Sequence, residues 1–159
     1  MKRVLVVGGA GYIGSHVAWV LQESGYKVRI FDDFSNGLRR RVDGFFEDVF
    51  VGDVLDRNEL AAAMNEVDSI IYLAAKKAVG ESVLDPLKYY SNNVGGILNA
   101  LAAMSLKGIR KLVFSSTAAV YSPSSTDAIN ESDQLSPLSP YGETKLLSEK
   151  LISKVAEAE

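Results

Sequence analysis

A cluster of glycines near the start of the chain constrains its fold more than any other feature. An apolar run over residues 2–7 leads into Gly8, and Gly11 and Gly14 follow at intervals of three residues. Buried parallel strands are near-continuous apolar runs, and glycines at this spacing after a strand are a variant of the dinucleotide-binding fingerprint. Gly8 permits the tight turn, Gly11 lets the backbone approach a pyrophosphate, and Gly14 lets the next helix pack closely on the sheet.

The helix expected after this turn begins near Tyr12 and stops at Gly25, a residue type common just past helix ends. Its N-terminus would offer free N–H groups and a partial positive charge to phosphates. The apolar residues that share one stripe of this helix are Ile13, Val17, Val20 and Leu21.

A second apolar run, residues 27–31, ends at Asp32. The dinucleotide-binding fingerprint includes an acidic residue about 20 residues after the glycines, and Asp32 lies at that position. A carboxylate there accepts from the ribose 2′-hydroxyl and repels a 2′-phosphate, so the pattern favours NAD over NADP. Three arginines at 39–41 could in principle approach a phosphate instead. We interpret them as a solvated loop, because Asp32 and Asp33 come first.

Short apolar runs and helical patterns alternate along the rest of the chain. We expect strands at 48–51, 68–74 and 111–115, and a long Ser-, Pro- and Asp-rich loop at 122–139. Asp56 and Glu59 form a capping-box start for a helix through Met64. Another helix opens at Asp85-Pro86, with Leu87, Tyr90, Val94, Ile97, Leu98 and Leu101 at helical spacing.

Five strands with intervening helices predict an α/β fold: a doubly wound parallel sheet (Rossmann fold) of strand order 3-2-1-4-5. We expect one NAD-binding domain over residues 1–159. Ligands of such sheets lie at the carboxyl ends of the strands. The residues expected at or just past strand ends are Gly8, Asp32, Asp53, Ala74 and Thr117.

Tyr141 and Lys145 lie four residues apart in Ser139-Pro-Tyr-Gly-Glu-Thr-Lys145. Ser139 can cap a helix, Pro140 suits its first turn, and residues i and i+4 share one face. An ammonium close to a phenol favours the ionised phenol, which would make Tyr141 a usable acid and base. If the pair is catalytic, we expect Thr117 to face Tyr141 and Lys145. The alternative is that the segment is an ordinary amphipathic helix.

Composition narrows the function classes. With a net charge of −3, no basic stripe indicates nucleic acid as a partner, and the absence of cysteine excludes disulfides and thiolate metal sites. The single histidine, His16, has no clustered partners, so we expect no metal site. No secretory signal and no apolar stretch of membrane-spanning length is visible, which favours a cytoplasmic protein with no membrane partner.

Several motifs together resemble the extended short-chain dehydrogenase/reductase family, and within it most closely the UDP-glucose 4-epimerases. They run through nearly the whole chain, and Lys77-Ala-Val-Gly-Glu-Ser-Val83 is the most epimerase-like. The other matching stretches are residues 8–16, 32–37, 52–54, 73–83, 89–94, 114–121 and 139–145.

The resemblance implies a role for each matching residue. Thr117 replaces the family's more usual serine and donates to a sugar oxygen, Tyr141 is the acid/base, and Lys145 holds the nicotinamide ribose. The cofactor-binding residues that the fingerprint and the resemblance give are Gly8, Gly11, Tyr12, Ile13, Gly14, Asp32, Asp33, Phe34, Ser35, Asn36, Gly37, Asp53, Val54, Leu73, Ala74, Ala75, Lys77, Asn92, Tyr141 and Lys145.

The implied reaction is the interconversion of UDP-glucose and UDP-galactose, a step of galactose metabolism, by transient oxidation of C4 with NAD as cofactor. Ala118 and Ala119 follow Thr117 where related dehydratases carry an acid pair, which argues against dehydration. The resemblance also implies a UDP-sugar partner, and a homodimer through helices 86–104 and 140–156. The alternative is that the apolar faces of those helices only cover the sheet.

Family members continue past the Tyr-Lys helix into further strands and a substrate lobe, so we expect this chain to be an N-terminal NAD-binding domain without its C-terminal substrate domain. Three hypotheses follow. The chain is the cofactor half of an epimerase; it is an NAD-binding module that turns nothing over alone, which we favour for the chain as it stands; or it belongs to another nucleotide-sugar oxidoreductase or epimerase of the family.

Overall fold

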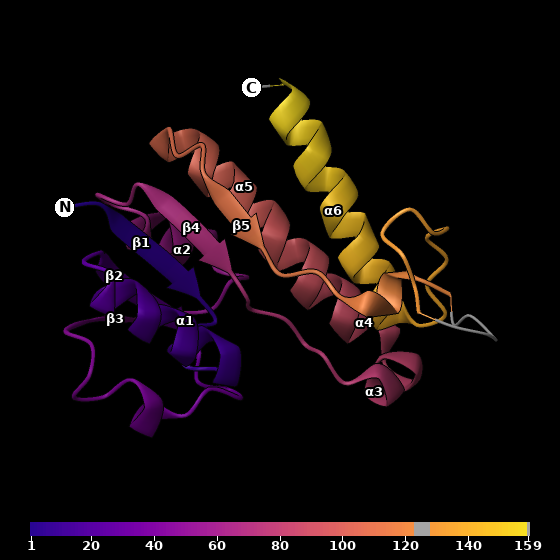
Figure 1. Cartoon of the computed structure of the whole chain (residues 1–159), viewed down its shortest axis with the longest axis horizontal. Coiled ribbons are helices and arrows are strands. Elements are labelled where there is room, and N and C mark those ends of the chain that lie inside the picture. Colours follow the sequence, from indigo (N-terminus) through magenta and orange to yellow (C-terminus); the bar gives the residue numbers. More distant parts are fainter. Residues whose placement is uncertain (123–127, 159) are drawn as a thin grey trace. The chain divides into compact units, whose positions relative to one another are not determined.

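The computed structural model describes residues 1–122 and 128–158 (Figure 1). Residues 123–127 of the expected loop therefore lie outside the described residues. The chain divides into two compact units: unit 1 is Met1–Ala75 with Asn99–Ser115, and unit 2 is Lys76–Leu98 with Ser116–Glu159. Each unit is described by itself below.

Unit 1 holds a parallel sheet of five strands in the order β3-β2-β1-β4-β5, so the predicted fold class and strand order are confirmed. Every strand falls within two residues of its expected place, and β4 is the most shortened. The strands are β1 (Arg3–Val7), β2 (Lys27–Asp32), β3 (Asp48–Val51), β4 (Ser69–Tyr72) and β5 (Leu112–Phe114).

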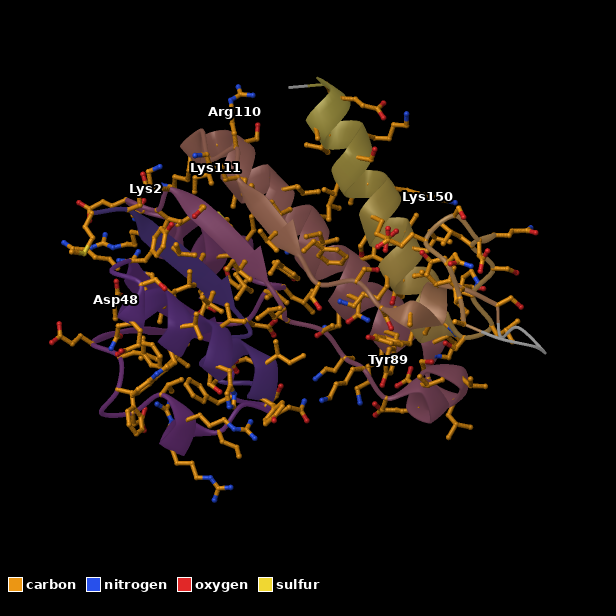
Figure 2. All side chains as sticks on the ribbon, viewed as in Figure 1. Lys2, Asp48, Tyr89, Arg110, Lys111 and Lys150 are labelled. Carbon is orange, nitrogen blue, oxygen red and sulfur yellow. The ribbon has the colours of Figure 1, made fainter. Side chains whose placement is uncertain are left out.

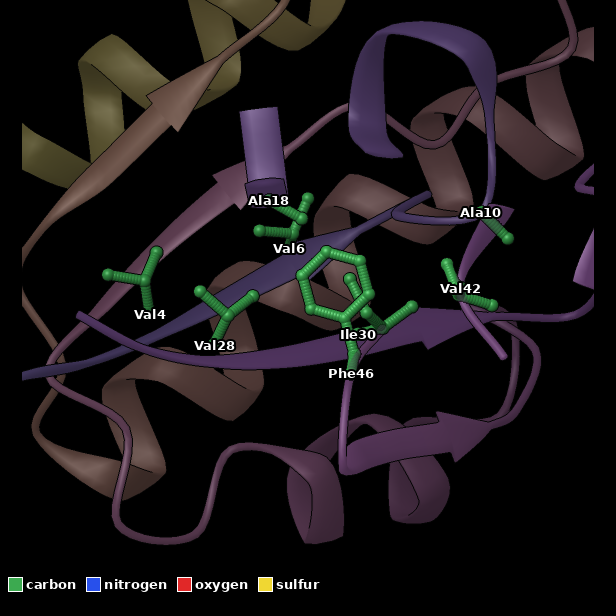
Figure 3. Close-up of a cluster of buried hydrophobic side chains, with 8 residues drawn as sticks. All are labelled: Val4, Val6, Ala10, Ala18, Val28, Ile30, Val42 and Phe46. Carbon is green, nitrogen blue, oxygen red and sulfur yellow. The ribbon is translucent and has the colours of Figure 1, made fainter. Parts of the chain in front are cut away.

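Strands β1 and β2 carry buried side chains on both faces, as continuous apolar runs predict for parallel strands, whereas the edge strands β3 and β5 are only partly buried. The register pairs Val4 with Val28 and Val6 with Ile30, so these side chains share one face. They form a buried cluster that the adjoining segments complete (Figure 3). The members of this cluster are Val4, Val6, Ala10, Ala18, Val28, Ile30, Val42 and Phe46.

Helix α1 (Tyr12–Glu23) packs on that face through Ala18. It ends as predicted at Gly25, whose φ is +82°. The N–H of Gly25 donates to the Gln22 carbonyl and the N–H of Tyr26 donates to the Leu21 carbonyl, the pair of bonds that defines a Schellman motif.

The buried face of α1 differs from the predicted apolar stripe. Gly14, Ser15 and Ala18 are its buried residues, whereas Ile13 and Val20 are exposed. A side chain at Gly14 would not fit, because its Cβ would lie 2.1 Å from the Gly8 carbonyl oxygen. Leu21 of the predicted stripe is partly buried against the cluster.

Helix α2 (Arg57–Ala63) lies on the opposite face, and Asn99 of α5 (Gly95–Lys107) is hydrogen-bonded to the segment that precedes it. Arg29 points to the α2 face: it donates to the Ala63 carbonyl at 2.8 Å and pairs with Asp48 at 2.9 Å. Asp48 is labelled in Figure 2.

The capping box predicted for α2 is half formed. Asp56 accepts from the N–H groups of Asn58 and Glu59, as expected of an N-cap. Glu59 does not return to the Asp56 N–H; it accepts from the Asp53 N–H at 3.0 Å. The Asp56 N–H donates instead to the Asp53 carbonyl. The Glu59 side chain therefore stabilises the turn after β3.

Unit 2 is helical in its described part. It contains α3 (Val79–Leu84), α4 (Pro86–Tyr89), the π-helical turn η2 (Tyr90–Val94), the start of α5, the 3-10 turn η3 (Ala118–Val120) and α6 (Pro140–Ala158). The helix predicted from Asp85-Pro86 does begin there, with the Asp85 side chain accepting from the Lys88 N–H. Helix α3 was not predicted.

The π turn η2 changes which residues of this helical stretch are buried. Tyr89 and Asn93 are buried, whereas Leu87 and Leu98 of the predicted stripe are 77% and 54% exposed. A π turn inserts an extra residue into the helical repeat, so a spacing rule for an unbroken helix holds for only part of the stretch. Ile97 and Leu101 of the predicted stripe are buried. Among the described residues, no helix is long and apolar enough to cross a membrane.

Candidate functional site

The glycine turn between β1 and α1 has no room for side chains at two of its three positions. A Cβ on Gly8, whose φ is +82°, would lie 2.7 Å from the Ala74 nitrogen, and one on Gly14 would lie 2.1 Å from the Gly8 carbonyl oxygen. Gly11 differs: it is the N-cap of α1 with a φ of −68°, and a Cβ there would meet only the Gly8 carbonyl, at 3.2 Å. Space on Gly11 therefore stays open toward the outside of the turn.

The first turn of α1 suits an anion. Gly11 caps the helix without a side-chain hydrogen bond, and the first turn carries no acidic residue. The N–H groups there and the positive end of the helix dipole favour phosphate oxygens. This local geometry agrees with the pyrophosphate position that the glycine spacing predicts.

Asp32 is 7% exposed, and both of its carboxylate oxygens are already engaged. Oδ2 accepts from the Ala10 N–H and Oδ1 from the Phe34 N–H, each at 2.9 Å. Burial raises the pKa of the Asp32 carboxyl above its ordinary value; the two backbone hydrogen bonds oppose this rise and the nearby Asp33 adds to it. Asp32 therefore joins the glycine turn to the loop after β2, a role that sequence reasoning missed.

The loop after β2 passes very close to this carboxylate. A Cβ on Gly37 would lie 2.6 Å from Asp32 Oδ1 and 2.7 Å from the Ala10 Cβ. Asp33 stabilises the same loop by accepting from the Ser35 N–H at 2.8 Å. The segment 32–37 is therefore a compact turn at the carboxyl end of β2.

The three arginines were predicted to be a solvated loop; Arg39 and Arg40 are exposed, and Arg41 is partly buried. They form a 3-10 turn, η1 (Arg39–Arg41), beside the glycine turn. The Arg39 guanidinium lies 4.3 Å from the Phe34 ring centroid and that of Arg41 lies 5.9 Å from the Tyr12 ring. Cations over aromatic faces are held by the ring quadrupole, a contact that residue types alone do not reveal.

The remaining candidates of unit 1 lie after β3 and β4. Val54 is buried, and its carbonyl accepts from the Asn99 amide at 3.1 Å. Leu73 packs against the cluster of Figure 3, and its N–H donates to the Val7 carbonyl. Together with the Gly8–Ala74 approach, these contacts bring the unit 1 candidates to the carboxyl ends of β1 to β4, as predicted.

In unit 2, the start of α6 forms as its sequence predicts. The Ser139 Oγ accepts from the Gly142 N–H at 3.2 Å, and Pro140 is the first helical residue. Tyr141 and Lys145 follow on this helix, one turn apart. Lys145 is only 3% exposed, and burial lowers the pKa of its ammonium to about 8, with Glu149 opposing the shift.

The segment that carries Thr117 lies against the first turn of α6. Thr117 caps η3 by accepting from the Ala119 N–H at 3.2 Å, which leaves its hydroxyl hydrogen available to donate. A Cβ on Gly142 would lie 2.3 Å from the Ala119 carbonyl oxygen. Unit 2 thus brings the Thr117 segment to the helix that carries Tyr141 and Lys145.

A buried asparagine absent from the predicted site holds this arrangement. Asn93 of η2 accepts from the Lys76 N–H at 2.8 Å and donates to the Lys76 carbonyl and to Thr144 Oγ1, both at 3.0 Å. The predicted cofactor residue Asn92 donates to Asn93 Oδ1 at 3.1 Å. The sequence signal that could have identified Asn93 is an amide side chain within an otherwise apolar helical pattern. The other predicted cofactor residue of this segment, Lys77, is exposed.

Glu81 organises the other end of unit 2. Its carboxylate accepts from the Lys88 ammonium at 2.6 Å and from the Tyr89 hydroxyl at 2.7 Å. Tyr89, labelled in Figure 2, also accepts from the Ala78 N–H at 3.0 Å. No group of acidic or histidine side chains within the described ranges is arranged to hold a metal ion.

Comparison with known proteins places these features in a family. A model of the NAD dependent epimerase/dehydratase family matches residues 4–159. The UDP-glucose 4-epimerase of Bacillus subtilis (strain 168) is 40% identical over 98% of this chain and 48% of its own length. That of Rhizobium leguminosarum bv. trifolii is 44% identical over 96% of this chain and 46% of its own.

Solved structures give the same result. UDP-glucose 4-epimerase from Brucella ovis in complex with NAD has a TM-score of 0.94 and 41% identity, covering 99% of this chain and 49% of that one. The chain therefore spans about half the length of the curated relatives it matches, 48% and 46% for the two above. These matches confirm the resemblance inferred from the motifs.

Proposed function

The chain belongs to the NAD dependent epimerase/dehydratase family, and we propose that it is the NAD-binding part of a UDP-glucose 4-epimerase. The observation that carries the proposal is the start of α6. There a lysine that is 3% exposed follows Tyr141 by one turn, and the Thr117 segment packs on the same helix. Burying an ammonium is costly, so a lysine in such a place is better explained by chemistry than by stability.

The residues present suit NAD. The turn at Gly11 is open to an approaching pyrophosphate, and the Asp32 oxygens retain lone pairs for ribose hydroxyls beside their backbone bonds. When bound, NAD supplies reversible oxidation of a carbinol carbon. The residues that we propose to hold it are Gly8, Gly11, Tyr12, Ile13, Gly14, residues 32–37, Asp53, Val54, residues 73–75, Lys77, Asn92, Tyr141 and Lys145.

Three side chains of unit 2 would act on the sugar. Tyr141 takes the proton from the 4-hydroxyl and later returns it to the 4-oxygen. Thr117 donates its hydroxyl hydrogen to that oxygen. The hydrogen is available because Thr117 Oγ1 only accepts in its bond with the Ala119 N–H. The positive charge of Lys145 favours the ionised form of a neighbouring phenol and binds a ribose hydroxyl.

The relatives that the chain matches are named UDP-glucose 4-epimerases and are about twice its length. We therefore propose that the chain alone binds NAD without turnover, as one NAD-binding domain. The alternative is the corresponding part of another nucleotide-sugar oxidoreductase or epimerase. A homodimer through helices 86–104 and 140–156 is a further proposal, which the exposure of Leu87, Leu98 and Leu147 supports.

A chimera tests the activity. The part of the Bacillus subtilis relative that this chain matches is replaced by this chain, and UDP-galactose is supplied. We expect UDP-glucose to form without net NADH, and a Tyr141→Phe chimera to be slower by about 100-fold or more. Net NADH without inversion at C4 would support the alternative oxidoreductase. A folded, NAD-loaded chimera that makes neither product would refute the proposal.

A further inference from the structure

Glu149 is the acidic residue of α6 that lies one turn beyond Lys145. Its carboxylate accepts a hydrogen bond from the Ser116 hydroxyl, which reaches it from the segment after β5. Ser116 directly precedes Thr117, whose backbone leads into η3. A single carboxylate is therefore tied to the segment that carries one proposed catalytic group and shares a helix face with another.

Lys145 and Glu149 are four residues apart on α6, the spacing at which opposite charges attract. Glu149 is the charged group that supports the Lys145 ammonium against the cost of burial. Because Lys145 is 3% exposed, water screens this attraction little. Loss of the Glu149 charge would therefore favour the neutral amine.

The other charged groups on elements packed against α6 are already engaged. Glu81 of α3 binds Lys88 of α4 and the Tyr89 hydroxyl. Glu143, in the first turn of α6, accepts from the Tyr90 hydroxyl of η2. The turn η3 consists of Ala118, Ala119 and Val120 and has no titratable side chain, and Tyr141 lies one turn before Lys145.

We propose that Glu149 is a positioning residue with two separable effects: it anchors the Ser116–Thr117 segment to α6, and its charge keeps Lys145 in the ammonium form. The proposal rests on the function proposed above, because both effects matter only where Thr117 and Lys145 act on a bound sugar. Glu149 itself does not need to touch substrate or cofactor. Its importance comes from fixing one hydroxyl and one charge through separate contacts.

The test is an NMR titration of the unliganded chain with two readouts. The side-chain signal of Lys145 reports its protonation midpoint, and the methyl signal of Thr117 reports its surroundings. Glu149→Gln removes the charge but keeps an oxygen that can accept from Ser116. Ser116→Ala keeps the charge but removes the donor. Glu157→Gln is the matched control, because it removes an exposed carboxylate of the same helix that pairs with Lys154.

Each variant has its own expected result. Glu149→Gln lowers the Lys145 midpoint by about one pH unit, a tenfold change in protonation, and leaves the Thr117 methyl signal in place. Ser116→Ala moves the Thr117 methyl signal and does not lower the midpoint. Glu157→Gln changes neither signal. Glu149→Asp retains the charge on a shorter side chain, so it moves the Thr117 methyl signal and leaves the Lys145 midpoint in place. This variant separates the two effects if Glu149→Gln does not fold.

Two outcomes would overturn the proposal. An unchanged Lys145 midpoint in Glu149→Gln removes the electrostatic effect, and an unchanged Thr117 signal in Ser116→Ala removes the anchoring effect. Neither readout uses NAD or turnover. A chain that fails to bind NAD but shows both changes would therefore refute the proposed function, while the two effects of Glu149 on Lys145 and on the Ser116–Thr117 segment would stand.

Discussion

Replacing Lys145 by methionine should stabilise the unliganded chain near neutral pH. Methionine keeps a flexible chain of similar length and removes the charge. Lys145 is 3% exposed, and burial lowers the pKa of its ammonium from 10.5 to about 8, with the Glu149 attraction already included. At 1.36 kcal/mol per unit, this difference corresponds to about 3 kcal/mol of free energy of unfolding.

The sign of this effect depends on pH. Below pH about 8 the lysine is protonated in both the folded and the unfolded chain, so folding carries the whole burial cost. Between pH about 8 and 10.5 the unfolded chain binds more protons than the folded one, so the free energy of unfolding rises with pH. The Lys145→Met chain lacks this rise, and its advantage over wild type should fall toward zero across that interval.

Urea unfolding at several pH values measures this difference. Far-ultraviolet circular dichroism is the appropriate signal, because Lys145 lies in α6 whereas the single tryptophan, Trp19, lies in unit 1. Comparing variant with wild type cancels the titration of every other group. A variant less stable than wild type near neutral pH, or an advantage that does not change with pH, would refute the reasoning.

Three further perturbations follow from the packing. Gly142→Ala should lower the free energy of unfolding by about 1–3 kcal/mol, because the new Cβ would lie 2.3 Å from the Ala119 carbonyl oxygen. Gly80→Ala is the comparison: a Cβ there meets nothing within 4 Å, so alanine should raise the free energy of unfolding by up to about 1 kcal/mol. Urea unfolding measures both changes. Asn93→Ala should cost about 2–3 kcal/mol by the same assay, since it removes the four hydrogen bonds of a buried side chain. Asp32→Asn should lower the melting temperature even without NAD, because an amide can accept only one of the two backbone N–H bonds; an unchanged melting temperature would show that Asp32 does not brace the turn.

The sheet could be predicted from the sequence because its signals are local. Five apolar runs, three of which end in glycine or aspartate, give five strands, and the alternation with helical patterns leaves few topologies. The spacing of Gly8, Gly11 and Gly14 adds a steric requirement at a single turn. The same reasoning places the start of α6 at Ser139-Pro140, where the cap and the first turn are encoded side by side.

Features that depend on contacts between distant segments could not be predicted. The π turn at residues 90–94 contains Asn93, which is hydrogen-bonded to Lys76 and Thr144. Because these partners are distant in sequence, no rule of residue spacing predicts the turn. Asp32 was predicted to bind a ribose, but its bond to the Ala10 N–H joins residues 22 positions apart. Asp32→Ala is therefore a poor probe of ribose binding alone, since it would also loosen the turn.

Calorimetric titration of the chain with NAD tests the central claim most directly. Gly11→Ala is the informative variant: its φ of −68° suits alanine and the new Cβ meets only the Gly8 carbonyl, so the chain should fold while the methyl group blocks the pyrophosphate. Gly80→Ala, in open space, is the control. We expect NAD to bind wild type and Gly80→Ala equally, and Gly11→Ala at least about tenfold more weakly, or about 1.4 kcal/mol. A folded wild-type chain that does not bind NAD, or a Gly11→Ala chain that binds it as wild type does, would contradict the account.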